Sequence, residues 1–166
     1  MVKIETPKGT ASELQLVHPD TRFDPEGKYK ARITLSAFDA AALIGVFKEE
    51  AINELGPKKA SKAKMPGNKL EDGAYQFSFK SKAKPRIYDS NGTLLEPATV
   101  EALRIGMGST IRINGEAKAY ENGAIIGVTL YLHEVQVIHL VRSPDCGFEA
   151  DAEGSFVIGA NRLPDC

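Results

Sequence analysis

Hydrophobic and polar residues alternate along most of the chain, which is the period of a β-strand with one buried face. The alternation predicts strands over residues 9–18, 28–36, 73–82, 109–120, 124–132 and 134–141. A further hairpin is predicted over 86–95, around the Asn91-Gly92 turn. The chain is therefore expected to be mainly β.

One segment has a helical period instead. From Ala37 to Leu55, hydrophobic residues recur at intervals of three and four, and they are Phe38, Ala42, Leu43, Val46, Phe47, Ile52 and Leu55. Ser36 can cap the start of this helix, and Gly56-Pro57 ends it. Residues 58–72 lack periodicity and are expected to be a loop, and 97–108 a short helix or turn segment.

Length and charge divide the chain into two parts. The 166 residues, 42% of them hydrophobic, suit one domain with a real core. The net charge of -1 is unevenly distributed: residues 1–142 hold 20 basic against 17 acidic side chains, whereas 143–166 hold one against five. We expect a basic domain over 1–142 and an acidic, flexible C-terminal tail over 143–166.

Positive charge is densest in residues 57–86, where nine lysine and arginine side chains face two acids, a net +7. A solvated lysine-rich loop would account for such a run by itself. Cations also share strand faces with aromatic rings. In 109–120, for example, Arg112, Lys118 and Tyr120 lie opposite a hydrophobic face.

Cations that follow a phosphate backbone, interleaved with rings on which bases stack, suit sequence-tolerant binding of single strands. The candidate DNA-binding residues are Lys28, Lys30, Arg32, Lys58, Lys59, Lys62, Lys64, Lys80, Lys82, Lys84, Arg86, Tyr88, Arg112, Lys118, Tyr120 and Tyr131. Their tyrosines suit the core equally well, and Tyr29, Tyr75, Phe77 and Phe79 are assigned to it. The predicted helix carries one lysine against four acids, which disfavours double-strand recognition.

An antiparallel barrel of five to six strands with one inserted helix, at about 37–55, is the layout of an OB-fold, which commonly binds oligonucleotides. In the tail behind it, Asp145, Glu149, Asp151 and Glu153 can occupy the basic groove when DNA is absent. When DNA displaces them, they become available to basic partners. Two alternatives remain: a β-rich structural or adaptor protein such as a virion component, and, third, a metal-dependent nuclease.

Motifs of catalysis are missing from the sequence, so we expect no enzyme, no cofactor and no metal site. His18, His133 and His139 show no paired ligand spacing with Cys146 and Cys166. Reduced thiols are the favoured interpretation of the two cysteines, with a disulfide as the alternative. No hydrophobic run approaches the ~20 residues of a membrane span, and no signal peptide is visible, so we expect a soluble, intracellular protein.

Several short motifs of the sequence belong together: Gly9-Thr10-Ala11, Pro19-Asp20 and Phe23–Lys30 in the first half, and Gly108–Arg112, the Tyr120 turn and Gly127–Val137 in the second. In these motifs the chain resembles the replicative single-stranded DNA-binding proteins of tailed podophages. The similarity spans residues 9–141, with a variable middle.

The resemblance implies an OB-fold that coats single-stranded DNA in phage replication, recombination and repair within the host cytoplasm. It implies a homodimer, and contacts of the acidic tail with the phage DNA polymerase and helicase. Lys3 matches the family's N-terminal basic position, Lys28 and Lys30 its first basic strand, and Tyr120 an aromatic near the groove. The tail ends without the family's terminal aromatic, which leaves Phe148 and Phe156 as candidate anchors.

Overall fold

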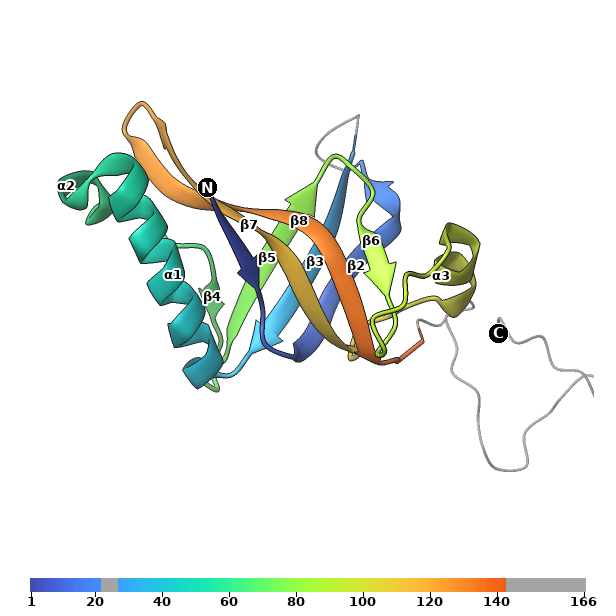
Figure 1. Cartoon of the computed structure of the whole chain (residues 1–166). Helices are drawn as coiled ribbons and strands as arrows, with labels where there is room; N and C mark the ends of the chain where they lie inside the picture. Colours follow the sequence, from blue (N-terminus) through green and yellow to red (C-terminus); the bar gives the residue numbers. More distant parts are fainter. Residues whose placement is uncertain (22–26, 143–166) are drawn as a thin grey trace, which may run out of the picture.

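The computed structural model describes residues 1–21 and 27–142 (Figure 1). Within these ranges the strands are β1 (Val2–Glu5), β2 (Gly9–Asp20), β3 (Lys28–Leu35), β4 (Asn68–Lys69), β5 (Tyr75–Ser81), β6 (Arg86–Tyr88), β7 (Thr110–Asn122) and β8 (Ile125–His139). The helices are α1 (Ala37–Leu55), α2 (Pro57–Ala60) and α3 (Pro97–Leu103). The chain is mainly β, as its alternating pattern predicts.

Five of these strands close into a barrel. Going around it, β2 pairs with β3, β3 with β5, β5 with β8, β8 with β7, and β7 again with β2. All of these pairings are antiparallel except that of β8 with β5. Strand β1 continues the pairing of β2 along β7, and β6 adds to β8 in parallel. The result is an OB-fold-like barrel, in agreement with the fold class predicted from the sequence.

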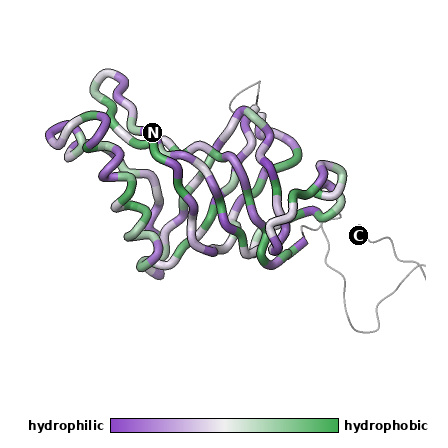
Figure 2. The backbone as a smooth tube through the Cα atoms, in the orientation of Figure 1, coloured by the Kyte–Doolittle hydropathy of each residue, from purple (hydrophilic) through white to green (hydrophobic). Residues whose placement is uncertain are grey.

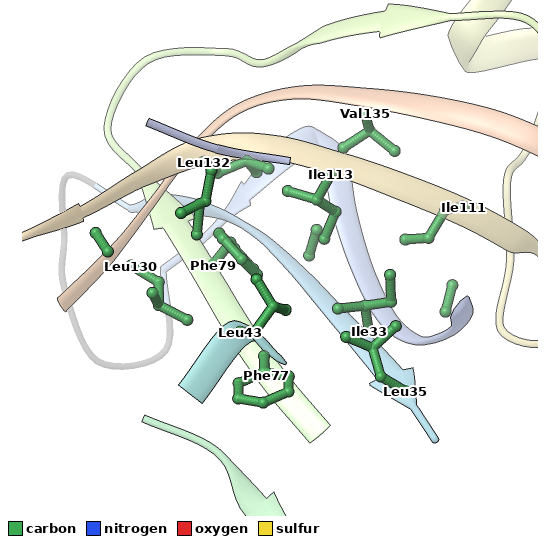
Figure 3. Close-up of a cluster of buried hydrophobic side chains, with 14 of the residues drawn as sticks. Ile33, Leu35, Leu43, Phe77, Phe79, Ile111, Ile113, Leu130, Leu132 and Val135 are labelled. Carbon is green, nitrogen blue, oxygen red and sulfur yellow. The ribbon is translucent and has the colours of Figure 1, made fainter. Parts of the chain in front are cut away.

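The barrel interior is filled by side chains from every strand of the ring (Figure 3). Phe77, Phe79, Ile33, Ile113 and Val135 are completely buried there. Alternation between hydrophobic and hydrophilic residues is visible along the strands in Figure 2. Because side chains of a strand point alternately to opposite faces, the polar half of each strand is left on the outer surface.

Helix α1 has the predicted boundaries, and its buried face keeps Leu43 and Phe47 of the predicted apolar positions. Ser36 accepts a hydrogen bond from the backbone N–H of Asp39, and Gly56 ends the helix at φ 84°. Ala40, Leu43, Phe47 and Ala51 face the barrel, and Leu43 reaches its interior (Figure 3). The predicted apolar positions Phe38 and Ile52 are wrong, since they are 87% and 44% exposed.

Three stretches depart from the predicted secondary structure. Strand β1 was not expected, because four residues are too few to show a period. Residues 125–139 form one strand in place of two, because a shift of register between Asn114 and Gly115 lets β7 and β8 stay paired along their length. Within the predicted loop, short elements α2 and β4 occur.

The C-terminal segment 143–166, with both cysteines and all of the predicted tail residues, lies outside the described residues. The proposed boundary at 142 therefore stays a prediction. Among the residues that the structure does describe, no helix is long and apolar enough to cross a membrane.

Candidate nucleic-acid interface

The β7–β8 hairpin presents two tyrosines on its outer surface. Its register places Tyr120 opposite Gly127, Lys118 opposite Thr129, and Glu116 opposite Tyr131. Alternate residues of a strand lie about 6.8 Å apart, so the two tyrosine positions are separated by about 14 Å along the hairpin. Each tyrosine is more than a third exposed, at 38% for Tyr120 and 39% for Tyr131.

The ring of Tyr120 lies over Gly127. A Cβ atom added at Gly127 would come within 2.8 Å of the Tyr120 hydroxyl oxygen and 3.0 Å of the ring carbon that carries it. A glycine is therefore required for the ring to lie this close to the sheet. The hydroxyl end of the ring lies against the backbone of Gly127, and the side chain keeps 38% of its surface exposed.

Lysines flank this aromatic pair on the side of β8 away from β7. Lys64 forms a parallel bridge with Gly127, donating its backbone N–H to the carbonyl of Ile126 (2.8 Å). Further along the same side, Lys80 of β5 is the register partner of Tyr131. Two segments far apart in the sequence, the loop after α2 and β5, thus bring one lysine beside each tyrosine.

We call the outer surface formed by Lys64, Lys80, Lys118, Tyr120 and Tyr131 the hairpin face. The three lysines form no ion pair among the residues that the structure describes. Their charges are therefore available to a phosphate backbone, and the two exposed tyrosine rings lie among them. Lys3 lies in line with Tyr131 across the sheet, because Lys3 of β1 pairs with Glu116 of β7 and Glu116 pairs with Tyr131 of β8.

The cations predicted on β3 are engaged within the protein. Lys30 donates to the buried carboxylate of Asp20 at 2.7 Å. Arg32 donates to the hydroxyl of Ser78 at 3.0 Å and pairs with Glu13 at 3.2 Å. Both side chains lie on the outer surface of the barrel, as predicted, but carboxylates of the same protein already offset their charges.

Further predicted cations are also paired with acids. Lys59 lies 2.9 Å from Glu121, Arg86 lies 3.7 Å from Glu134, and Arg112 lies 3.7 Å from Glu5. Exposed pairs of this kind are weak and exchange readily with other anions.

A hollow of about 470 Å³ lies across β1, β7, β8 and the start of β6, with Lys3, Arg86 and His133 in its lining. Three carboxylates line it as well, so it offers no net positive charge. Nearby, Tyr88 forms a hydrogen bond with Glu134, which raises the pKa of Tyr88 above its usual value. The hydroxyl of Tyr88 is thus already engaged by a carboxylate of the same protein.

The remaining predicted lysines lie outside the hairpin face as defined above. Lys58 lies on α2 and Lys62 just after it, both exposed. Lys82 and Lys84 lie in the exposed turn between β5 and β6. Lys28 begins β3 and pairs in register with Asp20. Of the sequence-predicted cations, the hairpin face therefore holds Lys64, Lys80 and Lys118.

Gly127 was not among the predicted site residues, although it shapes the position of Tyr120. The hairpin turn could have revealed its role. Once Asn122 is paired with Ile125, counting outward from the turn pairs Tyr120 with Gly127 and gives every further pair as far as Gly115 and Leu132. The turn was predicted over 121–123, whereas the structure has it at 123–124, between Asn122 and Ile125. An error of this size in the turn pairs each side chain of the hairpin with the wrong partner.

Groups of three or more histidine, cysteine, aspartate or glutamate side chains that could hold a metal are not found within residues 1–21 and 27–142. The features that the described residues do present are a basic and aromatic outer surface on an OB-fold-like barrel. OB-folds commonly bind oligonucleotides on such a surface.

Comparison with solved structures points to particular relatives of this fold. The single-stranded DNA-binding protein gp2.5 of bacteriophage T7 superposes with a TM-score of 0.66 at 22% identity, covering 90% of this chain and 98% of that one. The single-stranded DNA-binding protein of bacteriophage Enc34, in complex with single-stranded DNA, matches with a TM-score of 0.64 at 15% identity, over 82% and 86%. Its C-terminal truncation gives 0.66 at 16% identity, over 82% and 85%. No family model matches the sequence, and a search of curated proteins finds no significant match.

Proposed function

We propose that this protein binds single-stranded DNA without sequence preference, through the hairpin face. The observation that carries the proposal is the pairing of exposed rings with unpaired lysines: Tyr120 beside Lys64, and Tyr131 beside Lys80, with Lys118 between them. Stacking of a base on an aromatic ring is worth about 1–3 kcal/mol, and it tolerates any base because every base has a π-face.

Charge supplies the second part of the affinity. A single strand releases about 0.7 counterions for each phosphate that a cation neutralises, so three lysines predict a salt slope of about -2. Cations that are paired with carboxylates in the free protein add less, because DNA must first compete with those carboxylates. Lys30 and Arg32 are accordingly assigned to the stability of the barrel, with the carboxylate of Asp20 and that of Glu13 as their partners.

The relatives of the fold favour single strands over double strands as the ligand. The printed names of the phage proteins with this fold describe single-stranded DNA binding, and one of them is a complex with such DNA. The only long helix of the described chain, α1, is acidic on its exposed side and unsuited to a major groove. We extend the proposal to the coating of single-stranded DNA in phage replication, recombination and repair.

A titration tests the proposal directly. A labelled oligo-dT strand is titrated with the full chain at several salt concentrations, and the same sequence as a duplex serves as the control. We expect micromolar or tighter binding of the single strand at low salt, with affinity falling steeply as salt rises. Absence of binding at low salt would refute the proposal and favour a structural or adaptor role.

The acidic C-terminal residues complete the proposal. Residues 143–166 carry a net charge of -4, and as a free segment they would compete with phosphate for the basic surface at low salt. We propose that the same residues contact basic surfaces of replication enzymes such as a polymerase or helicase. A homodimer, host-cytoplasmic location and absence of catalysis belong to the same proposal.

A further inference from the structure

A second surface, far from the hairpin face, has the features of a peptide-binding site. A hollow of about 560 Å³ lies between the second half of β2 and α3. It is in the size range of small-ligand sites. Leu14, Leu16, Val17, Val100 and Ile105 give it an apolar lining. Helix α3 and the tip of the β7–β8 hairpin lie at opposite ends of the barrel (Figure 1), so we expect DNA bound around Tyr120 to leave this hollow uncovered.

The β2 wall of this hollow lacks regular strand pairing. The register between β2 and β3 breaks after Gln15 and resumes only at Asp20, so Leu16–Pro19 have no residue-for-residue partner on β3. On its other side β2 pairs with β7 only at Gly9 and Thr10 within the described ranges. The segment can therefore receive the backbone of an additional extended peptide.

A buried acceptor also lies at this wall. The side-chain oxygen Oε1 of Gln15, a lining residue, is buried and accepts no hydrogen bond in the described structure. Leaving a buried polar atom without a partner is costly, and such atoms usually mark the place of a missing donor. An extended peptide in the hollow would bring backbone N–H donors to it.

The last described residue lies at the edge of this hollow. Arg142, the last described residue, donates to the carbonyls of Ala102 (3.0 Å) and Leu103 (3.3 Å) at the end of α3. It also forms a bridge with Ile105, which lines the hollow. The first bulky hydrophobic residue beyond it is Phe148, six residues on, which an extended chain of about 20 Å brings within reach of the hollow.

We propose that residues 145–149 of this chain dock in the hollow between β2 and α3, with the ring of Phe148 on its apolar lining. The charges agree with this occupant. Residues 143–161 contain four acidic side chains and no lysine or arginine. Arg104 lines the hollow, as does the exposed His18, while the one acid of the lining, Asp20, is already paired with Lys30. The contact is intramolecular, and it leaves Asp151 and Glu153, beyond the docked residues, to compete with DNA for the basic surface.

The test uses the fact that the sequence has no tryptophan. In the full chain, Phe148→Trp introduces a single tryptophan at the proposed anchor, and Phe156→Trp is the matched control. Without DNA, we expect blue-shifted emission and several-fold weaker acrylamide quenching for Phe148→Trp than for Phe156→Trp. Adding Val17→Asp, which places a charge in the lining, should return the Phe148→Trp emission to that of the control, while circular dichroism checks that the barrel is intact.

Hydrogen exchange on the unlabelled protein gives an independent measurement. Transfer of a phenyl ring out of water shifts a docking equilibrium by about tenfold or more, so Phe148→Ala should speed exchange at the amides of Leu16–His18 by that factor. Equal emission and quenching of the two tryptophan variants, or unchanged exchange in Phe148→Ala, would overturn the proposal. A blue shift that disappears on dilution would overturn it too, because it would place the segment on a second copy or another molecule.

Discussion

Replacing Tyr120 by leucine tests whether the hairpin face binds bases by stacking. The leucine removes the aromatic ring and keeps an apolar side chain over Gly127, so the hairpin should stay folded. No lysine is altered by the change. We therefore expect weaker binding of single-stranded DNA with an unchanged dependence on salt, because salt dependence reports phosphate contacts and not stacked bases.

The size of the loss follows from the position of the ring. The hydroxyl end of Tyr120 lies against Gly127, and the side chain is 38% exposed, so we expect a base to stack on one side of the ring. A stacked base contributes about 1–3 kcal/mol. With a single stacking side we expect the lower part of that range, about 1–2 kcal/mol, which corresponds to a roughly 5- to 30-fold higher Kd.

The assay is fluorescence anisotropy of a labelled oligo-dT strand at four or more salt concentrations, with Tyr120→Phe as the matched control. The phenylalanine keeps the ring and loses only the hydroxyl, so its Kd should stay close to that of the unaltered protein. Equal losses in Tyr120→Phe and Tyr120→Leu would show that the hydroxyl matters and the ring does not. A Tyr120→Leu protein with unchanged Kd would refute stacking at this position.

Four further outcomes are expected. Lys80→Ala should weaken binding and make the salt slope less steep by about 0.7, measured in the same titration. Gly127→Ala should push the Tyr120 ring away from the sheet and so lower DNA affinity. The same change should lower the free energy of unfolding, measured in urea titrations, by about 1 kcal/mol. The carboxylate of Glu50 pairs with the Met1 ammonium at 2.9 Å, and their hydrogen bond raises the pKa of that ammonium above its usual 8.0. The stabilisation is therefore complete below pH 8.0 and lost as pH rises through the raised pKa, so melting temperatures of Glu50→Gln and the unaltered protein should converge at alkaline pH. Deleting residues 143–166, which removes a net charge of -4, should raise DNA affinity at low salt and have little effect at high salt.

Each of these four has a result that contradicts it. An unchanged slope in Lys80→Ala would remove that lysine from the phosphate contacts. Full affinity in Gly127→Ala would show that the position of the ring does not matter. A constant difference in melting temperature across alkaline pH would exclude the ammonium as the partner of Glu50. Equal affinity of the intact and shortened chains at low salt would show that residues 143–166 do not compete with DNA.

The local pattern of the sequence was sufficient for most of the secondary structure. Helix α1 begins and ends where Ser36 and Gly56 predict, because capping is a local interaction between neighbouring residues. Its buried face was mispredicted at Phe38, since hydrophobicity alone does not reveal which of two apolar stripes meets the barrel. The charge run of 57–86 was correctly located, but its division between β5, α2 and the connecting loops depends on how the chain returns to the sheet.

The sequence by itself determined that the chain is a mainly β barrel with one long inserted helix, and that cations and aromatic rings share the outer faces of its strands. Alternation and capping are encoded within a few residues, so they can be read directly. Only the tertiary structure decided which cations remain available: Lys30 meets Asp20, whereas Lys64 and Lys80 come beside Tyr120 and Tyr131. Those neighbours lie on different strands, and their meeting depends on strand register and barrel closure, which no local pattern contains.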